Sequence, residues 1–278
     1  MTLQELMRAA RTRIAHVTTD DAMRELRVLA AHAIKVEPSR LTLHLHDAVN
    51  EDQRAHFDAM IEQRAQSMPV SKIVGHRLFW GRAFGVDTDV LDPRGDTETL
   101  IAACLELGAQ DHVLDLGTGS GAIGLTLAAE WPGAQVTCTD YSTAALKTAR
   151  QNCAALGLTE RVSLVRSDWF ENVTGQFDLI VSNPPYISLE EWRGLDPEVR
   201  DFDPRMALTD EADGLTAYKA ITQGAGAHLN VGGHLMVEIG WMQGDAVQAL
   251  FQQAGFSEVT CLQDLAGRDR VITGAHLK

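Results

Sequence analysis

The chain has 278 residues, of which 45% are hydrophobic and 22% charged, a composition typical of a globular protein with one or two domains. Its four cysteines are scattered with no C-x-x-C pair, so we expect reduced thiols, no disulfide framework and no bound metal. Nearly all of the net charge of −14 falls in residues 94–278, which disfavours binding of nucleic-acid phosphates by that part of the chain. No apolar run predicts a membrane helix or a secretion signal.

Apolar residues recur at helical spacing in three segments of the first 70 residues, which predicts a small helical domain. These segments begin at Leu3, near Asp20 and at Asn50. Residues 71–93 follow as a linker, in which two short apolar runs around Gly81 predict a β-hairpin.

From residue 94 onward, strand-like and helix-like segments alternate. The predicted strands are His112–Leu116, Gln135–Thr139, Val162–Arg166, Phe177–Ser182, His234–Ile239, Glu258–Leu262 and Arg270–Thr273. The predicted helices are Ala122–Glu130, Ser142–Ala155, Gly214–Ala227 and Gln243–Ala254. This alternation predicts an α/β domain with a seven-stranded, mainly parallel, Rossmann-like sheet whose ligands bind at the carboxyl ends of the strands.

A glycine-rich turn joins the first predicted strand to the first predicted helix. The triplet Gly119, Gly121 and Gly124 matches the dinucleotide fingerprint G-x-G-x-x-G, so a nicotinamide-dependent oxidoreductase is one alternative. The longer pattern D-x-G-x-G-x-G, which begins at Asp115, is instead typical of S-adenosylmethionine (SAM) sites. The residues predicted to line such a site are Gly117, Thr118, Gly119, Ser120 and Gly121.

Carboxylates and an aromatic residue follow the next two strands. Asp140 is placed to accept both ribose hydroxyls of a bound nucleoside, although it could instead cap the helix that starts near Ser142. Trp169 offers a face for the adenine and Asp168 an acceptor for its amino group, with plain core packing as the alternative for Trp169.

The tetrapeptide Asn183-Pro184-Pro185-Tyr186 follows the fourth strand. Asn183 Oδ1 and the Pro184 carbonyl are two acceptors in a stiff turn, and they suit the two N–H groups of a planar amide or an exocyclic amine. The alternative is a simple turn that leaves a buried strand. In a doubly wound sheet this turn adjoins the glycine loop, which predicts transfer of the SAM methyl group to nitrogen.

With these motifs the chain resembles the HemK/PrmC family, the glutamine methyltransferases of peptide chain release factors, over nearly its whole length. The resemblance also includes P-R-G-D-T-E (Pro93–Glu98), V-E-I-G (Val237–Gly240) and A-G-R-D-R (Ala266–Arg270). Two positions depart from the family pattern, since Lys72 stands where Tyr is common and Gly95 where Pro is common.

The resemblance implies a class I SAM-dependent methyltransferase domain over residues 94–278, with S-adenosylhomocysteine as the product. It implies methylation of the side-chain amide nitrogen of the glutamine in the Gly-Gly-Gln loop of class 1 release factors, which supports translation termination. Residues 1–70 would dock the release factor, and residues 71–93 would link the domains. Asn183 would contact both the cofactor region and the substrate amide, while Pro184, Pro185 and Tyr186 shape the pocket. We expect a cytoplasmic monomer without nucleic-acid or membrane partners.

Three other functions share parts of this pattern. A ribosomal-protein glutamine and an exocyclic amine of DNA are alternative methyl acceptors, and the acidic charge and the lack of a recognisable target-recognition domain count against DNA. A SAM-binding module without catalysis is the third, but an intact Asn-Pro-Pro-Tyr would serve no purpose in it.

Overall fold

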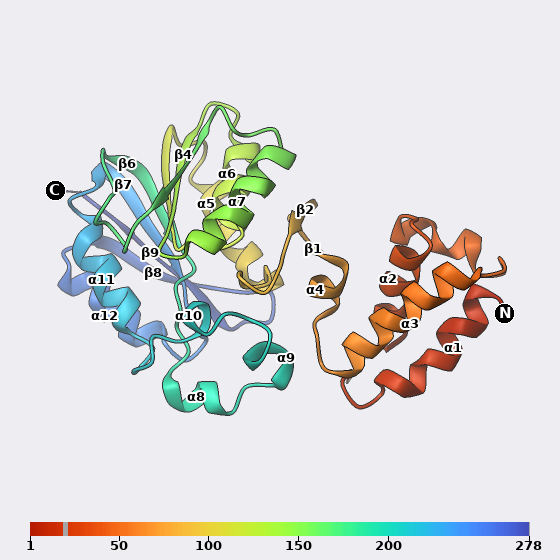
Figure 1. Cartoon of the computed structure of the whole chain (residues 1–278). Coiled ribbons are helices and arrows are strands. Elements are labelled where there is room, and N and C mark those ends of the chain that lie inside the picture. Colours follow the sequence, from red (N-terminus) through yellow and green to blue (C-terminus); the bar gives the residue numbers. More distant parts are fainter. Residues whose placement is uncertain (19–21, 278) are drawn as a thin grey trace. The chain divides into compact units, whose positions relative to one another are not determined.

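The computed structural model describes residues 1–18 and 22–277, which form two compact units (Figure 1). The N-terminal unit consists of Met1–His76 together with the returning segment Pro197–Phe202. The C-terminal unit consists of Arg77–Asp196 and Asp203–Lys278. The helices of the N-terminal unit are α1 (Leu3–Ile14), α2 (Ala22–Ala33), η1 (Pro38–His44), α3 (Glu51–Ala65), α4 (Val70–Val74) and α9 (Pro197–Arg200).

The helices of the N-terminal unit pack through the apolar stripes that the sequence displays. Leu6, Leu26, Phe57 and Ile61 are buried in one cluster. Capping boxes open α1 at Thr2 and α3 at Asn50, because each side chain accepts from the backbone N–H three residues on. The predicted start of the second helix near Asp20 lies outside the described residues.

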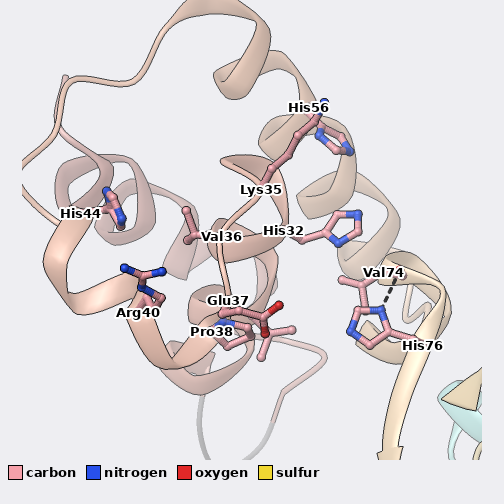
Figure 2. A pocket seen from close by; sticks show the side chains of 11 residues that line it. His32, Lys35, Val36, Glu37, Pro38, Arg40, His44, His56, Val74 and His76 are labelled. Carbon is pink, nitrogen blue, oxygen red and sulfur yellow. Dashed lines mark hydrogen bonds between the residues drawn. The ribbon is translucent and has the colours of Figure 1, made fainter. Parts of the chain in front are cut away.

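A cavity of about 660 Å³ lies in the N-terminal unit beside α2 (Figure 2). Its wall includes four histidines, His32, His44, His56 and His76. The His32 ring centroid lies 5.6 Å from that of His56 and 6.4 Å from that of His76. Burial, followed by the charges of His56 and His76, lowers the pKa of His32. No residue of the glycine loop or of Asn183–Tyr186 lines this cavity.

The C-terminal unit is built on a seven-stranded sheet of order β5-β4-β3-β6-β7-β9-β8 (Figure 1). Its strands are β3 (His112–Leu116), β4 (Gln135–Asp140), β5 (Val162–Arg166), β6 (Phe177–Ser182), β7 (Leu229–Glu238), β8 (Ser257–Gln263) and β9 (Asp269–Ala275). All pairings are parallel except the two that β9 makes, so the predicted mainly parallel sheet is confirmed. The predicted hairpin is also present, as β1 (His76–Phe79) and β2 (Arg82–Gly85).

Helices cover both faces of this sheet. The helices of this unit are η2 (Gly95–Thr97), α5 (Glu98–Glu106), α6 (Ala122–Glu130), α7 (Thr143–Ala155), α8 (Leu189–Arg193), α10 (Arg205–Leu208), α11 (Thr216–Ala225) and α12 (Gly244–Gln253). Of these, α5, α6 and α7 pack on one face of the sheet, and α11 and α12 pack on the other. Consecutive residues of β3 point to opposite faces: Val113 packs into a core with Leu125 of α6, and Leu114 into a second core with Tyr218 of α11. The central strands β3 and β6 are buried on both faces and are therefore mostly apolar.

Four predicted elements have the same bounds in the structure: residues 112–116, 122–130, 162–166 and 177–182. The helices α4, α5, α8, α9 and α10 were not predicted. None of the described helices combines the length and the apolar character that crossing a membrane requires.

Candidate active site

The carboxyl ends of β3, β4 and β6 meet at one edge of the sheet and bring the predicted site residues together. Leu116, the last residue of β3, pairs with Thr139 of β4 and with Ser182 of β6. The Ser182 hydroxyl donates to the Leu116 carbonyl at 2.7 Å and ties the two strand ends together. Gly117, Asp140 and Asn183 each follow one of these three paired residues, so they lie at neighbouring strand ends.

The backbone of the glycine loop has the left-handed conformation at alternate positions. The φ angles of Gly117, Gly119 and Gly121 are 69°, 56° and 86°, which L side chains rarely adopt. A Cβ atom on Gly117 or Gly119 would meet no described atom within 4 Å, so the space above the loop is open to a ligand. Glycine is needed there for the backbone conformation and for close approach of the ligand.

Asp115 holds this loop from below. Its Oδ2 atom accepts from the Thr118 hydroxyl at 2.5 Å and from the Gly124 N–H at 2.9 Å. Full burial raises the pKa of the Asp115 carboxyl to about 6, although both hydrogen bonds act to lower it. The sequence pattern marked Asp115 as a motif residue, and the structure assigns it to shaping the loop. Thr118 is itself buried, so a ligand would meet its backbone.

The Asp140 carboxylate connects the glycine loop to the start of α7. Its Oδ2 atom accepts from the Gly119 N–H at 2.9 Å, and its Oδ1 atom accepts from the Ser142 N–H at 2.8 Å. Ser142 is the residue that caps α7, since its hydroxyl accepts from the Ala145 N–H, so the alternative of Asp140 as the helix cap is wrong. Burial raises the pKa of Asp140. Each carboxylate oxygen keeps a further lone pair, and a vicinal pair of ribose hydroxyls suits two such acceptors.

Asp168 and Trp169, the two predicted adenine contacts, follow β5 and differ in burial. Asp168 is exposed. Trp169 has a φ of 45° and packs against the cluster on the α11 face, so core packing accounts for part of its half-buried side chain. Contact of both residues with adenine stays a prediction.

The Asn183–Tyr186 turn presents its acceptors and anchors its last residue. Asn183 Nδ2 donates to the Thr97 hydroxyl oxygen at 3.2 Å, and no hydrogen bond among the described residues ends on Asn183 Oδ1 or on the Pro184 carbonyl. The Tyr186 carbonyl accepts from Gln243 Nε2 at 2.9 Å. Burial, then the nearby Glu238 charge, raises the pKa of the Tyr186 hydroxyl, so this phenol stays protonated at neutral pH.

Thr97, Glu238 and Gln243 contact this turn and were not predicted as site residues. Glu238 is 1% exposed, and burial raises the pKa of its carboxyl to about 7. The only signals were the segments P-R-G-D-T-E and V-E-I-G, which contain Thr97 and Glu238 and which carried the resemblance without a role.

The two departures from the family pattern, Lys72 and Gly95, lie in different units. Lys72 Nζ donates to the Phe202 carbonyl at 2.5 Å within the N-terminal unit. Gly95 opens η2, and a Cβ atom there would meet nothing within 4 Å, so the backbone does not require glycine.

This sheet order, with a glycine loop after β3, a carboxylate at the end of β4 and Asn-Pro-Pro-Tyr after β6, defines a SAM-dependent methyltransferase. The family descriptions that match are "Methyltransferase small domain", over residues 91–193, and "PrmC N-terminal domain", over residues 5–75.

Relatives covering almost the whole chain show the family. "Release factor glutamine methyltransferase" of Cereibacter sphaeroides is 50% identical over 98% of this chain and 98% of its own. The protein of the same name from Agrobacterium fabrum is 41% identical over 95% of this chain and 94% of its own. The chain therefore belongs to the release factor glutamine methyltransferase family, and the predicted resemblance is confirmed.

Solved structures of lower identity share the fold. A methyltransferase from Pyrococcus furiosus has a TM-score of 0.54 at 19% identity and covers 80% of this chain and 98% of its own. The hMettl16 catalytic domain, solved in complex with the MAT2A 3'UTR hairpin 6, has a TM-score of 0.60 at 16% identity and covers 79% of this chain and 82% of its own.

Proposed function

We propose that this protein transfers the methyl group of SAM to the side-chain amide nitrogen of the glutamine in the Gly-Gly-Gln loop of class 1 release factors, and so supports translation termination. The names of the full-length relatives support the substrate. The observation that carries the chemistry is the acceptor pair of Asn183 Oδ1 and the Pro184 carbonyl, which receive no hydrogen bond from the described residues and lie at the strand end next to the glycine loop.

The open glycine loop and the Asp140 carboxylate fit SAM. Bound there, SAM supplies an electrophilic methyl group. The loop would hold the methionine and ribose portions against the backbone, Asp140 would accept from the ribose hydroxyls, and Asp168 and Trp169 would face the adenine. The residues proposed to contact the cofactor are Gly117, Thr118, Gly119, Ser120, Gly121, Asp140, Asp168, Trp169 and Asn183.

The protein's main task with the substrate is to orient a weak nucleophile. A carboxamide nitrogen is unreactive because its lone pair is delocalised into the carbonyl. Asn183 Oδ1 and the Pro184 carbonyl each accept one N–H, which favours a pyramidal nitrogen with its lone pair directed at the methyl donor. Such positioning contributes up to about 7–11 kcal/mol in well-oriented systems.

No side chain is required to remove a proton before the new bond forms, because the amide nitrogen becomes strongly acidic only after it is methylated. The Tyr186 hydroxyl, whose pKa is raised, stays protonated at neutral pH and so is not available as a base. Tyr186 and Pro185 would instead form the wall of the pocket and exclude water. The nitrogen then loses one of its protons to solvent, which leaves the neutral N-methylated amide.

Further proposals concern the partner and the setting. The N-terminal unit is proposed to dock the release factor, supported by the match of residues 5–75 to a domain specific to this family. We expect a cytoplasmic monomer that acts on protein and not on nucleic acid, and the excess of acidic residues in the C-terminal unit supports the last point.

The test uses methyl-labelled SAM with a purified class 1 release factor, the same factor with its loop Gln changed to Ala, a ribosomal-protein preparation and duplex DNA. Label on the intact factor alone is the expected result. Label on the Gln→Ala factor, on ribosomal protein or on DNA would contradict the proposed substrate.

The Asn183→Ala variant tests the acceptor pair. We expect its turnover to be almost abolished while its SAM dissociation constant stays within about tenfold of wild type, because the loop and Asp140 carry cofactor binding. Asn230→Ala is the matched control, since Asn230 Nδ2 makes one side-chain hydrogen bond, to Asp178 Oδ1 at 2.8 Å. These two residues lie at the amino ends of β7 and β6, away from the carboxyl ends that carry the candidate site. A near wild-type rate for Asn183→Ala would refute the acceptor mechanism.

A further inference from the structure

The side chain of Gln243 ties the Asn183–Tyr186 turn to two neighbouring loops. Its Nε2 atom donates to the Tyr186 carbonyl at 2.9 Å and to the Gly214 carbonyl at 3.3 Å. Its Oε1 atom accepts from the Gly240 N–H at 3.0 Å. Tyr186 follows β6, Gly214 precedes α11 and Gly240 follows β7. One carboxamide group therefore joins three segments, one of which is the proposed substrate-binding turn.

The partners of this carboxamide fix the direction in which it faces. The carbonyl oxygens of Tyr186 and Gly214 can only accept, so they match the NH2 group, and the Gly240 N–H can only donate, so it matches Oε1. A flipped amide would place Oε1 against two carbonyl oxygens. The Tyr218 hydroxyl lies 3.5 Å from Oε1, but it donates its single proton to the Glu238 carbonyl at 2.9 Å and adds little to this network.

The backbone holds Gln243 at a fixed point. The Gln243 N–H donates to the Gly240 carbonyl at 2.9 Å and closes a four-residue turn, after which α12 begins at Gly244. The side-chain bond from the Gly240 N–H to Oε1 lies within the same turn. The carboxamide is therefore placed by its own turn before it reaches the other two segments.

Glycines on both sides leave the space that this carboxamide occupies. A Cβ atom on Gly214 would lie 2.9 Å from Gln243 Nε2, and one on Gly240 would lie 2.9 Å from Gln243 Oε1. The φ angle of Gly240 lies outside the left-handed region, so its backbone conformation does not require glycine. The close approach of the Gln243 amide is what excludes a larger residue there.

The Asn183–Tyr186 turn is stiff, so a change at its last residue reaches its acceptors. Pro184 and Pro185 fix their own φ angles, and each restricts the ψ angle of the residue before it. Few backbone torsions can therefore absorb a movement of Tyr186. A displacement of the Tyr186 carbonyl passes back to the Pro184 carbonyl, which is one of the two proposed substrate acceptors.

Gln243 supplies the hydrogen bond that fixes the Tyr186 carbonyl. No other hydrogen bond among the described residues ends on this oxygen. The opposite end of the same peptide group, the Ile187 N–H, donates to the Leu208 carbonyl at 3.0 Å. With both ends bonded the peptide plane has one orientation, and without the Gln243 amide it can pivot about the remaining bond.

We propose that Gln243 is a positioning residue for methyl transfer, which fixes the Tyr186 peptide group and, through the two prolines, the Pro184 carbonyl that accepts the substrate amide. This inference rests on the proposed role of the Pro184 carbonyl as a substrate acceptor. Gln243 makes no hydrogen bond to the glycine loop or to Asp140 among the described residues, so cofactor binding should be independent of it.

The experiment compares Gln243→Met and Gln243→Glu with wild type in methylation of a purified class 1 release factor, at saturating SAM and factor. Gln243→Met removes the side-chain hydrogen bonds at similar length, and Gln243→Glu presents a carboxylate oxygen to two carbonyl oxygens. We expect kcat to fall about 10-fold in Gln243→Met and about 100-fold in Gln243→Glu, because a misplacement of about 1 Å can cost about 100-fold. The SAM dissociation constant, measured by calorimetry, should stay within about threefold of wild type.

Gly240→Ala tests the same contact without changing Gln243, because the added Cβ atom would displace Oε1. It should lose as much kcat as Gln243→Met, and the double variant should lose little more than either single one. Gln110→Glu is the matched control, since Gln110 Nε2 also donates to a backbone carbonyl, that of Gly108 at 3.1 Å, ahead of the amino end of β3. This control should keep the wild-type kcat.

Urea unfolding establishes that each variant is assayed in its folded state. If Gln243→Glu does not fold, Gln243→Met and Gly240→Ala decide. A purely structural role predicts lower stability with a wild-type kcat in the folded protein, and that result would overturn the inference. An equal loss of SAM affinity would also overturn it, because the effect would then not be confined to the substrate turn.

The outcomes separate this inference from the proposed function. If Asn183→Ala is inactive while the folded Gln243 variants keep the wild-type kcat, the positioning role is wrong and the proposed function stands. If Asn183→Ala is fully active, the acceptor pair fails and the inference fails with it.

Discussion

Substitution of Asp140 by Asn tests the cofactor site most directly. The change keeps the size of the side chain but replaces one of two oxygens that already accept backbone N–H groups, at 2.9 Å from Gly119 and 2.8 Å from Ser142. The new NH2 group faces an N–H, so one charge-assisted hydrogen bond is lost at a cost of about 1.5–3 kcal/mol. The same atom can no longer accept from a ribose hydroxyl, so SAM affinity should fall by about 10- to 150-fold.

Two measurements distinguish the two effects. Calorimetric titration gives the SAM dissociation constant, and urea unfolding without SAM gives the stability. Asp178→Asn is the matched control, because that carboxylate also accepts from a backbone N–H, that of His112 at 2.9 Å, and from Asn230 at 2.8 Å. Asp178 lies at the amino end of β6, away from the carboxyl ends that carry the candidate site. The Asp178→Asn variant should therefore lose stability without losing SAM affinity. An unchanged dissociation constant in Asp140→Asn would refute the ribose assignment.

Three further predictions concern the packing and titration of the same unit. Gly124→Ala should lower stability by about 1–3 kcal/mol, since its Cβ would meet Cys138 Sγ at 2.5 Å and Asp115 Oδ2 at 2.9 Å, which outweighs the roughly 1 kcal/mol of added helix propensity. Gly214→Ala should lower kcat/KM but leave SAM affinity intact, because it strains a φ of 77° and its Cβ would collide with the Tyr186 carbonyl oxygen. Because its pKa is raised to about 6, Asp115 keeps its proton in the folded state at a pH where the unfolded chain has lost it. The free energy of unfolding should therefore fall by up to about 3 kcal/mol as the pH rises from about 4 through about 6. This fall should be smaller in Asp115→Asn, whose side chain does not titrate.

Gly133→Ala serves as the control for both glycine variants, because a Cβ atom there would meet nothing within 4 Å and its φ is not positive. Chemical unfolding and steady-state kinetics are the measurements. Wild-type stability in Gly124→Ala, wild-type kcat/KM in Gly214→Ala, or equal pH slopes for Asp115→Asn and wild type would each contradict the corresponding argument.

The central strands of the sheet were predictable because they are buried on both faces. The strand Phe177–Ser182 is mainly apolar apart from Asp178 near its start, and its predicted bounds agree with the structure. The antiparallel strand β9 extends further than predicted, to Asp269–Ala275, since its ends are set by pairing with β7 and β8. The short helices α8, α9 and α10 have four or five residues, too few to show a periodic pattern.

The site was predictable where function lies in one short segment, as in the glycine loop and Asn183–Tyr186. It was not predictable where a residue contacts the turn from a distant segment of the chain. Thr97 lies 86 positions from Asn183, and Glu238 lies 52 positions from Tyr186, and neither separation leaves a local pattern. The identity of the residue that caps α7 also depended on geometry, because Asp140 and Ser142 are both good caps in isolation.

The return of Pro197–Phe202 to the N-terminal unit means that the polypeptide crosses between units three times, after His76, Asp196 and Phe202. Arg64, with a side chain 2% exposed, pairs with Glu198 of that segment at 2.9 Å. No single proteolytic nick or gene truncation can therefore yield both halves intact. A fragment that lacks the first 76 residues would carry an orphaned Glu198, so separate expression of the halves should yield products less stable than the same halves within the intact enzyme.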